Sequence, residues 1–221
     1  MLQASVVDVR GLGRALRAVG ALAPEAALFC LDGRLCVRGM DGHRVVLAEA
    51  VLDAPASGAG RPSVQPKLLA AFCRSLPEDA TLRVDCTASE LRLSAGDDEV
   101  LRVPYRAHDL VQLRASAVEL DALLPKRKLD QAAAHVADGA FTLRAGAAAL
   151  EFVSCGGARR TVPAVVMRRG EVQAEASGVH LRRVCRAAGS AAASARLRVH
   201  ASGTLQVEFA LAGGALLRYT L

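Results

Sequence analysis

The sequence predicts an α+β fold built from two similar domains, each with helices on one face of a curved antiparallel sheet. Three observations predict it. Segments that alternate apolar and polar residues outnumber helical segments, which is typical of an antiparallel sheet with one buried face. The 221 residues are 52% hydrophobic, which is enough for a core in each of two domains. Finally, the second half of the chain echoes the first.

Two echoes indicate an internal duplication. Without a gap, EAALFCLDGRLCVRG at 25–39 matches QAAAHVADGAFTLRA at 131–145. A second echo aligns Leu69, Cys73, Arg74 and 82–84 with Leu181, Cys185, Arg186 and 197–199. The preserved order favours duplication over chance similarity in an alanine-rich chain. We therefore expect a first domain at 1–105, a connector at 106–113 and a second domain at 114–221.

The first half reads as a strand, a helix, a hairpin, a second helix and further strands. The strand-like segment 2–9 contains Asp8, whose carboxylate can cap the helix that follows it. The apolar face of that helix comprises Leu12, Leu16 and Val19. Residues 27–32 and 34–40 flank Asp32-Gly33, a strong hairpin signal. The second helix is expected at 65–76, with Leu68, Leu69, Phe72 and Leu76 inward, and the later strands at 81–87, 90–96 and 99–105.

The second half is expected to repeat this plan. A strand at 111–118 precedes a short helix at 120–130, which contains the unfavourable Pro125. Strands at 132–137 and 140–145 flank Asp138-Gly139. The remaining elements are a fourth helix at 178–189 and strands at 195–201, 204–211 and 215–221.

Basic residues occur on all four predicted helices. Arg10, Arg14 and Arg17 are spaced i, i+4, i+7, so they share one face of the first helix. The other helices carry Lys67, Arg74, Lys126, Arg127, Lys128, Arg182, Arg183 and Arg186. A solvated helix face normally mixes signs, and only Arg74 and Lys126 have an acidic residue four positions away. These cations predict a surface that contacts DNA phosphates, with ordinary exposed helix faces as the alternative.

The composition narrows the choice of partner. The net charge of +6 favours a polyanion. Aromatic residues make up only 3% of the chain, whereas binding of single strands usually requires aromatic stacking. The duplex backbone is therefore the better fit.

Other functional classes find less support. The N-terminus lacks the pattern of a signal peptide, and no apolar run approaches the ~20 residues of a membrane span, so we expect a cytoplasmic protein of the prokaryotic nucleoid, or a nuclear one. The six cysteines form neither a C-x-x-C pair nor a zinc pattern with histidine, and we expect no metal or other cofactor. Asp41, His43 and Glu49 are of catalytic type, but no nucleophile elbow or Gly-rich loop lies near them. We assign no catalytic residue; an enzyme that uses Asp41, His43 or a cysteine stays an alternative.

Several segments, in order along the chain, resemble the proliferating cell nuclear antigen (PCNA) family of archaeal and eukaryotic sliding clamps. GMDGHRVVLAEAVL at 39–52 is similar to the family's A-M-D-x-x-[RH]-V-x-L corner, and LRVPY at 101–105 to the end of its first domain. GVHLRRVCRAAG at 178–189 resembles the last clamp helix. TLQVEFALAGGALLRYTL at 204–221 resembles the closing hairpin. The resemblance spans nearly the whole chain.

The resemblance implies a processivity factor for DNA replication and repair, with no enzymatic activity of its own. Three subunits, copies of this chain or paralogous clamp subunits, would close a ring around double-stranded DNA without sequence preference. Edge strands at 98–105 and 160–167 would join neighbours. DNA polymerase, clamp loader, nuclease and ligase would bind through short peptide motifs. Their pocket would be bordered by Met40, Arg44, Val45, Leu110, Leu113, Thr204 and Thr220.

The chain also departs from the family pattern. Thr204 stands where the family has proline, and Thr220 stands where it has a second aromatic residue. Leu221 is not followed by the family's Ala-Pro. Typical members are acidic overall, whereas this chain is basic. A divergent clamp is therefore expected, with a checkpoint-type subunit of a heterotrimer or a monomeric processivity factor as alternatives.

Overall fold

The structure, a computed structural model, describes the chain except residues 44, 97–98, 109–115, 138, 169–173 and 212–213. It has an α+β fold, with mostly antiparallel strands and four α-helices among the described residues. The chain divides into two compact units. The first unit is Met1–Gln112 with Leu211–Leu217, and the second is Leu113–Ala210 with Arg218–Leu221. This division falls inside the segment predicted as the connector, of which residues 109–113 lie outside the described part.

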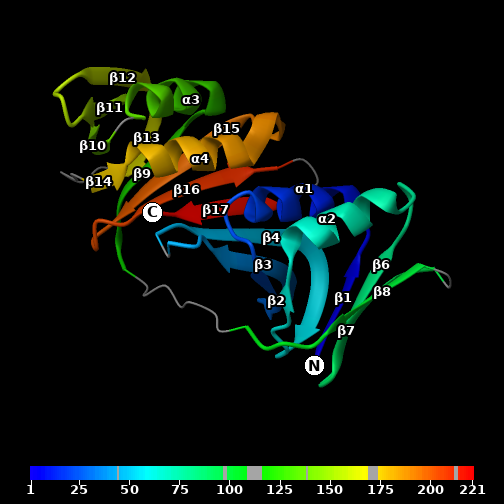
Figure 1. The fold of residues 1–221 in the computed structure, drawn as a ribbon. Helices are drawn as coiled ribbons and strands as arrows, with labels where there is room; N and C mark the ends of the chain where they lie inside the picture. Colours follow the sequence, from blue (N-terminus) through cyan, green and yellow to red (C-terminus); the bar gives the residue numbers. More distant parts are fainter. Residues whose placement is uncertain (44, 97–98, 109–115, 138, 169–173, 212–213) are drawn as a thin grey trace. The chain divides into compact units, whose positions relative to one another are not determined.

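In the first unit, antiparallel strands occur in the order β5-β2-β3-β4-β1-β6-β7-β8, and two helices lie side by side on one face of them (Figure 1). The strands are β1 (Leu2–Val6), β2 (Ala26–Leu31), β3 (Arg34–Met40), β4 (Leu47–Gly58), β5 (Ser63–Val64), β6 (Leu82–Cys86), β7 (Glu90–Ala95) and β8 (Glu99–Pro104). The helices are α1 (Val9–Gly20) and α2 (Pro66–Ser75).

The local signals of the first unit are confirmed where they involve neighbouring residues. The Asp8 carboxylate accepts a hydrogen bond from the Gly11 amide at 2.6 Å and caps α1. Asp32 and Gly33 both have positive φ, at 49° and 75°, as a two-residue hairpin between β2 and β3 requires.

The inward face of α2 differs in part from the prediction. Leu69 and Leu76 are buried, whereas Leu68 is 47% exposed and Phe72 only half-buried. The prediction was wrong for Leu68, because the buried stripe of this short helix runs through Leu69 and Cys73 against α1. Gly13 permits the close approach, since a Cβ there would lie 3.3 Å from the Cys73 Cβ.

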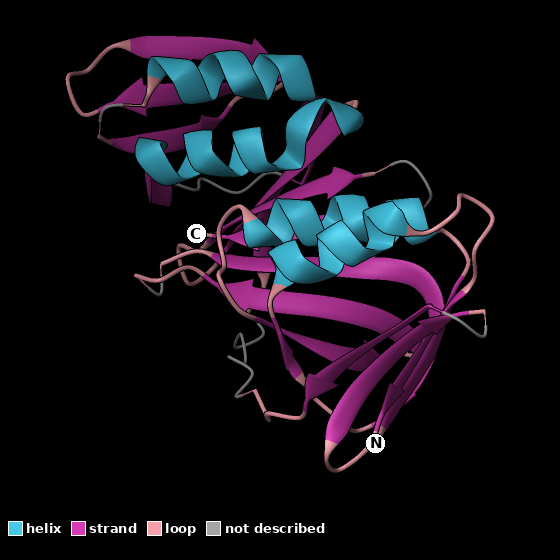
Figure 2. Cartoon of the chain, turned by 45° about the vertical axis from the view of Figure 1, so that its right-hand side comes forward, coloured by secondary structure: helices cyan, strands magenta, loops and turns pink. Residues whose placement is uncertain are grey.

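In the second unit, strands pair in the orders β13-β9-β15-β16-β17 and β12-β11-β10-β14, with two helices side by side on one face (Figure 2). The strands are β9 (Val118–Pro125), β10 (Ala140–Ala145), β11 (Ala149–Ser154), β12 (Arg159–Pro163), β13 (Val165–Arg168), β14 (Ala174–Ser177), β15 (Ser194–His200), β16 (Leu205–Ala210) and β17 (Leu216–Thr220). The helices are α3 (Lys126–His135) and α4 (Gly178–Ala188), and a 3₁₀ turn at Gly189–Ala191 follows α4.

The start of the second unit contradicts two predictions. Residues 120–125, expected to be helical, belong to β9, in which Leu120, Ala122 and Leu124 alternate as buried residues. Pro125 precedes α3 rather than interrupting it, because proline has no N–H and fits only at a helix start. The helix then runs through 132–135, which was expected to be a strand, and alanine is the best helix former.

The duplication is present in the topology, but one of the two echoes is misleading. The second echo is structurally consistent, since it aligns α2 with α4 and β6 with β15. The first echo aligns β2 with the end of α3 and the turn after it, and β3 with β10, so its residues are not equivalent. Both units nevertheless share equivalent pairings and a similar order of elements, in which β12 and β13 of the second unit stand where the first unit has the single strand β4. The pairs β1–β6, β2–β3, β2–β5 and β1–β4 correspond to β9–β15, β10–β11, β10–β14 and β9–β13.

Candidate nucleic-acid interface

The charge of the chain is segregated onto its helices. The four α-helices carry eleven basic residues and one acidic residue, Asp130. The whole chain has 28 basic and 22 acidic residues, so the rest holds 17 basic and 21 acidic ones and is acidic overall. The eleven helical cations are the predicted phosphate contacts, and the surroundings of each decide whether it can reach a ligand.

Two of the three arginines on α1 are held by the protein itself. The Arg10 guanidinium donates to the carbonyl oxygens of Arg74, at 3.1 Å, and Leu76, at 3.3 Å. These carbonyls lie at the C-terminal end of α2, where they have no partner within the helix. Arg14 Nη2 lies 3.5 Å from the Asp8 carboxylate. Arg17 is exposed, so the three residues share a face but are not equally available.

Lys126 is the clearest correction among the predicted DNA contacts. Its side chain is 9% exposed, and its Nζ lies 2.9 Å from both carboxylate oxygens of Asp130. The pair has the i, i+4 spacing that neighbouring turns of a helix bring together. Lys126 is therefore neutralised inside the second unit, and it is not free to contact a phosphate.

The remaining helical cations include six that are exposed, which we call the exposed helical cations. They are Arg17, Lys67, Arg74, Arg127, Arg182 and Arg186. Within the described part of the chain, none of the six forms an ion pair. Lys128 and Arg183 are half-buried. In each unit the exposed cations lie on the helices that cover one face of the strands.

The buried thiols beneath the helices are not nucleophiles. Burial raises the pKa of the Cys73 thiol on α2 to about 11, although Arg17 opposes the shift. Burial and the neighbouring Asp130 carboxylate raise the pKa of the Cys185 thiol on α4 to about 12. Both thiols are protonated at neutral pH, whereas a reactive cysteine needs its thiolate.

The corner after β3 uses its acidic residues to build the turn. Asp41 is 2% exposed, and its Oδ1 accepts hydrogen bonds from the amides of Val45, at 2.7 Å, and Val46, at 3.0 Å. The Asp41 amide in turn donates to the Val46 carbonyl at 2.9 Å. The Asp41 carboxylate therefore stabilises the corner that the turn residues predicted, and His43 beside it is exposed.

Glu49 is likewise occupied by a structural contact. It is 4% exposed and accepts from Arg38 Nε at 2.6 Å, with a second contact from Nη2 of the same guanidinium. The guanidinium also lies over the Phe29 ring, 4.9 Å from its centroid. Phe29 belongs to a small apolar cluster with Ala27 and Cys36. The carboxylate of Glu49 thus anchors the arginine that covers this cluster.

The predicted peptide-binding residues have mixed surroundings. In the first unit, Met40 is half-buried and Val45 is 47% exposed, while Arg44, Leu110 and Leu113 lie outside the described residues. In the second unit, Thr204 is half-buried, with its hydroxyl 2.9 Å from that of Ser202. Thr220 is only 7% exposed and its Oγ1 has no hydrogen-bond partner among the described residues, so its prediction as a surface contact was wrong.

An ionic network on the second unit was missed at the level of sequence. Asp121 on β9 accepts from Arg196 at 2.7 and 2.5 Å and from Arg198 at 3.4 Å. Glu208 on β16, 5% exposed, accepts from Arg198 at 3.0 Å and from Arg218 at 2.7 Å. The hydrogen bond from Arg196 holds the pKa of Asp121 below its usual value. The alternation of Arg196 and Arg198 along one strand was the available signal, but their partners come from other strands.

Several strands pair with one neighbour only among the described residues: β5, β8, β12, β13 and β14. In the first unit β8 pairs with β7 alone, and in the second unit β13 pairs with β9 alone. β13 displays Val165, 64% exposed, directly opposite Leu123 on β9, which is 39% exposed, and Met167 is 52% exposed. β8 lies in the segment 98–105 that was predicted as an edge, with residue 98 outside the described part, whereas the predicted edge strand 160–167 is divided between β12 and β13, which belong to different sheets.

No protein-family model matches the chain, and no curated protein matches it either. Among the described residues, no group of three or more His, Cys, Asp or Glu side chains is arranged to hold a metal ion. None of the described helices is long and apolar enough to span a membrane.

Proposed function

We propose that the chain is a divergent sliding-clamp subunit of the PCNA type, which holds duplex DNA against its helices and tethers replication and repair enzymes to it. The observation that carries the proposal is the segregation of charge. The helices hold a large excess of basic residues, and the six exposed helical cations have no acidic partner in the described structure. Such a surface suits a phosphate backbone and carries no means of reading base sequence.

Assembly into a ring would use two of the unpaired strand edges. An unpaired strand edge presents backbone N–H and C=O groups that accept another strand. The edge of β8 on one subunit and the segment 160–167 on the next are the proposed partners, and the exposed Val165 and Met167 would be covered there. The neighbouring subunits are copies of this chain or paralogous clamp subunits that complete a trimer.

The proposed mechanism is topological and involves no covalent chemistry. A closed ring cannot leave a continuous duplex sideways, yet phosphate contacts without base readout allow it to move along the DNA. An enzyme held by the ring then works at a raised effective concentration on its template. DNA polymerase, clamp loader, nuclease and ligase are the proposed partners, bound through short peptides beside Met40 and Val45. The structural roles of Asp41 and Glu49 and the protonated thiols of Cys73 and Cys185 support a non-catalytic protein.

Native mass spectrometry with a short blunt duplex tests the proposal. The expected species contains three subunits and one duplex, and an unrelated duplex of equal length gives the same result. A protein that stays monomeric and still binds duplex supports the monomeric processivity factor and contradicts the ring. A protein that binds no duplex at low salt contradicts both.

A further inference from the structure

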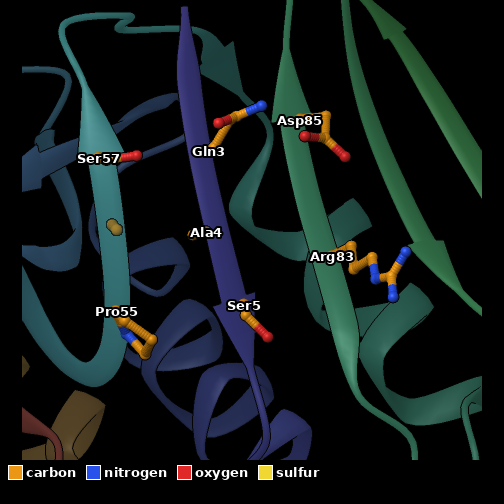
Figure 3. A pocket seen from close by; sticks show the side chains of 8 residues that line it. Gln3, Ala4, Ser5, Pro55, Ser57, Arg83 and Asp85 are labelled. Carbon is orange, nitrogen blue, oxygen red and sulfur yellow. The ribbon is translucent and has the colours of Figure 1, made fainter.

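A trough on the first unit lies on the face of the strands opposite α1 and α2. Its volume is about 390 Å³, and its lining comes from β1, β4 and β6. Figure 3 shows the helices passing behind these strands, with the polar side chains of the lining spread along them. The buried residues of β1 and β6, among them Leu2, Val6 and Val84, alternate with the lining residues and face the helices instead.

The trough exists because β1 and β4 separate. Their pairing covers Leu2 to Ala4 on β1 and ends at Ala56 on β4, so that Ser5 and Pro55 are not paired with each other. Pro55 has no N–H and could not donate a ladder hydrogen bond there. Beyond this point β1 continues beside β6 alone, with Ser5 opposite Arg83.

The polar side chains of the trough have no partners of their own. They are Gln3, Ser5, Ser57, Arg83 and Asp85. Within the described structure, no hydrogen bond or ion pair joins any of the five to another residue. Some outward-facing charges on other strands are paired, as Arg38 is with Glu49 and Arg196 is with Asp121, whereas Arg92 on β7 and Arg102 on β8 form no ion pair in the described structure.

Arg83 lacks the carboxylate partner that the equivalent arginine of the second unit has. The equivalent residue of the second unit is Arg198, because 82–84 on β6 aligns with 197–199 on β15. Arg198 faces Asp121 across the strand pair and also contacts Glu208. Arg83 faces Ser5 in the same position, so a carboxylate has been replaced by a hydroxyl. The guanidinium of Arg83 is thereby left for an anion that comes from outside the unit.

We propose that this trough binds an extended peptide segment of another protein that carries one acidic and one basic residue at alternate positions. Arg83 and Asp85 lie on the same face of β6, two residues apart, which corresponds to roughly 6.6 Å along a strand. An extended peptide beside them repeats its side chains with the same spacing, so its acidic residue meets Arg83 and its basic residue meets Asp85. Gln3, which lies opposite both Ser57 and Asp85, supplies a carboxamide for the peptide backbone.

This site is independent of the proposed DNA contacts, since it lies on the face that the helices leave uncovered. The opposite charges of Arg83 and Asp85 disfavour a nucleic acid, which would meet Asp85 as a like charge. They also distinguish a peptide from a simple anion, which would need Arg83 alone.

Two blocked five-residue peptides test the proposal in a calorimetric titration. Thr-Asp-Thr-Lys-Thr places its charges on one face of an extended chain, whereas Thr-Asp-Lys-Thr-Thr places them on opposite faces. The first peptide is expected to bind more tightly than the second. Arg83→Gln should weaken its binding by roughly fivefold, and so should Asp85→Asn. Arg102→Gln, an exposed change on β8 outside the trough, is the matched control and should leave binding unchanged.

An exchange of the two charges keeps the test decisive if a single substitution alters the fold. Arg83→Asp alone should abolish binding, and the combined Arg83→Asp, Asp85→Arg protein should recover it, because an extended peptide can bind in the reverse direction. Equal affinity for both peptides, or no detectable binding of either, overturns the proposal. Inorganic phosphate that binds with dependence on Arg83 but not on Asp85 would show a simple anion site and overturn it as well.

Discussion

Removing exposed cations from the helices of the first unit should weaken DNA binding in a way that a loss of net charge alone does not. The helical variant carries Arg17→Ala, Lys67→Ala and Arg74→Ala, all exposed and without ion pairs in the described structure. The control variant carries Arg83→Ala, Arg92→Ala and Arg102→Ala, which are exposed on the strand face opposite the helices. Each variant lowers the net charge by the same amount, so long-range attraction falls equally.

The magnitude follows from counterion release. Each phosphate contact contributes roughly 0.9 to the slope of log K against log salt, so three lost contacts should reduce the slope by about 2.7. The control should reduce it only slightly. Fluorescence anisotropy of a labelled duplex, titrated at several salt concentrations, measures both slopes, and circular dichroism checks the fold. Equal reductions in the two variants would refute the reasoning, because binding would then respond to total charge and not to the helical face.

Three further predictions concern single residues. Arg10→Met should lower the free energy of unfolding by about 1 kcal/mol in a denaturant titration, because the α2 carbonyls lose their donor, while the salt slope of DNA binding changes little. A reduced salt slope with an unchanged free energy of unfolding would contradict the capping role of Arg10. The lowered pKa of Asp121 means that its ionised form stabilises the fold above the ordinary value near ~4, and that this stabilisation is lost as pH falls through the folded pKa. Asp121→Asn should therefore flatten the acid side of the stability profile, and an unchanged profile would count against the network. Val165→Asp should weaken subunit association tenfold or more in light scattering, because a carboxylate would replace an apolar side chain at the proposed junction, whereas a change of stability without a change of mass would place the interface elsewhere.

The sequence was informative where a structural feature depends on adjacent residues. Asp8 as a cap and Asp32-Gly33 as a hairpin turn were predictable, because the interacting groups lie within a few positions of each other. The segment 120–125 was wrongly predicted to be helical. Its apolar residues from Leu120 to Leu124 alternate as in a strand, but a segment this short also fits a helical pattern.

The features that the sequence did not predict depend on tertiary contacts. That Arg10 caps α2 depends on how α1 packs against α2, and no local pattern reports a partner 64 residues away. The burial of Lys126 against Asp130 was indicated by their spacing, but spacing alone does not tell a buried pair from a solvated one. The second echo already aligned Arg83 with Arg198, but only the strand pairing shows that Arg83 faces Ser5 whereas Arg198 faces Asp121.

Retention on circular DNA tests the central claim most directly. The native assembly, purified with any partner subunits and loaded onto a nicked plasmid by its clamp-loading ATPase, is separated from free protein by gel filtration at raised salt. The account predicts that it stays with the circle, is lost when a restriction enzyme linearises the plasmid, and stays again when bulky proteins block both ends. Equal retention on circular and open linear DNA would show binding by contact alone and would contradict the ring.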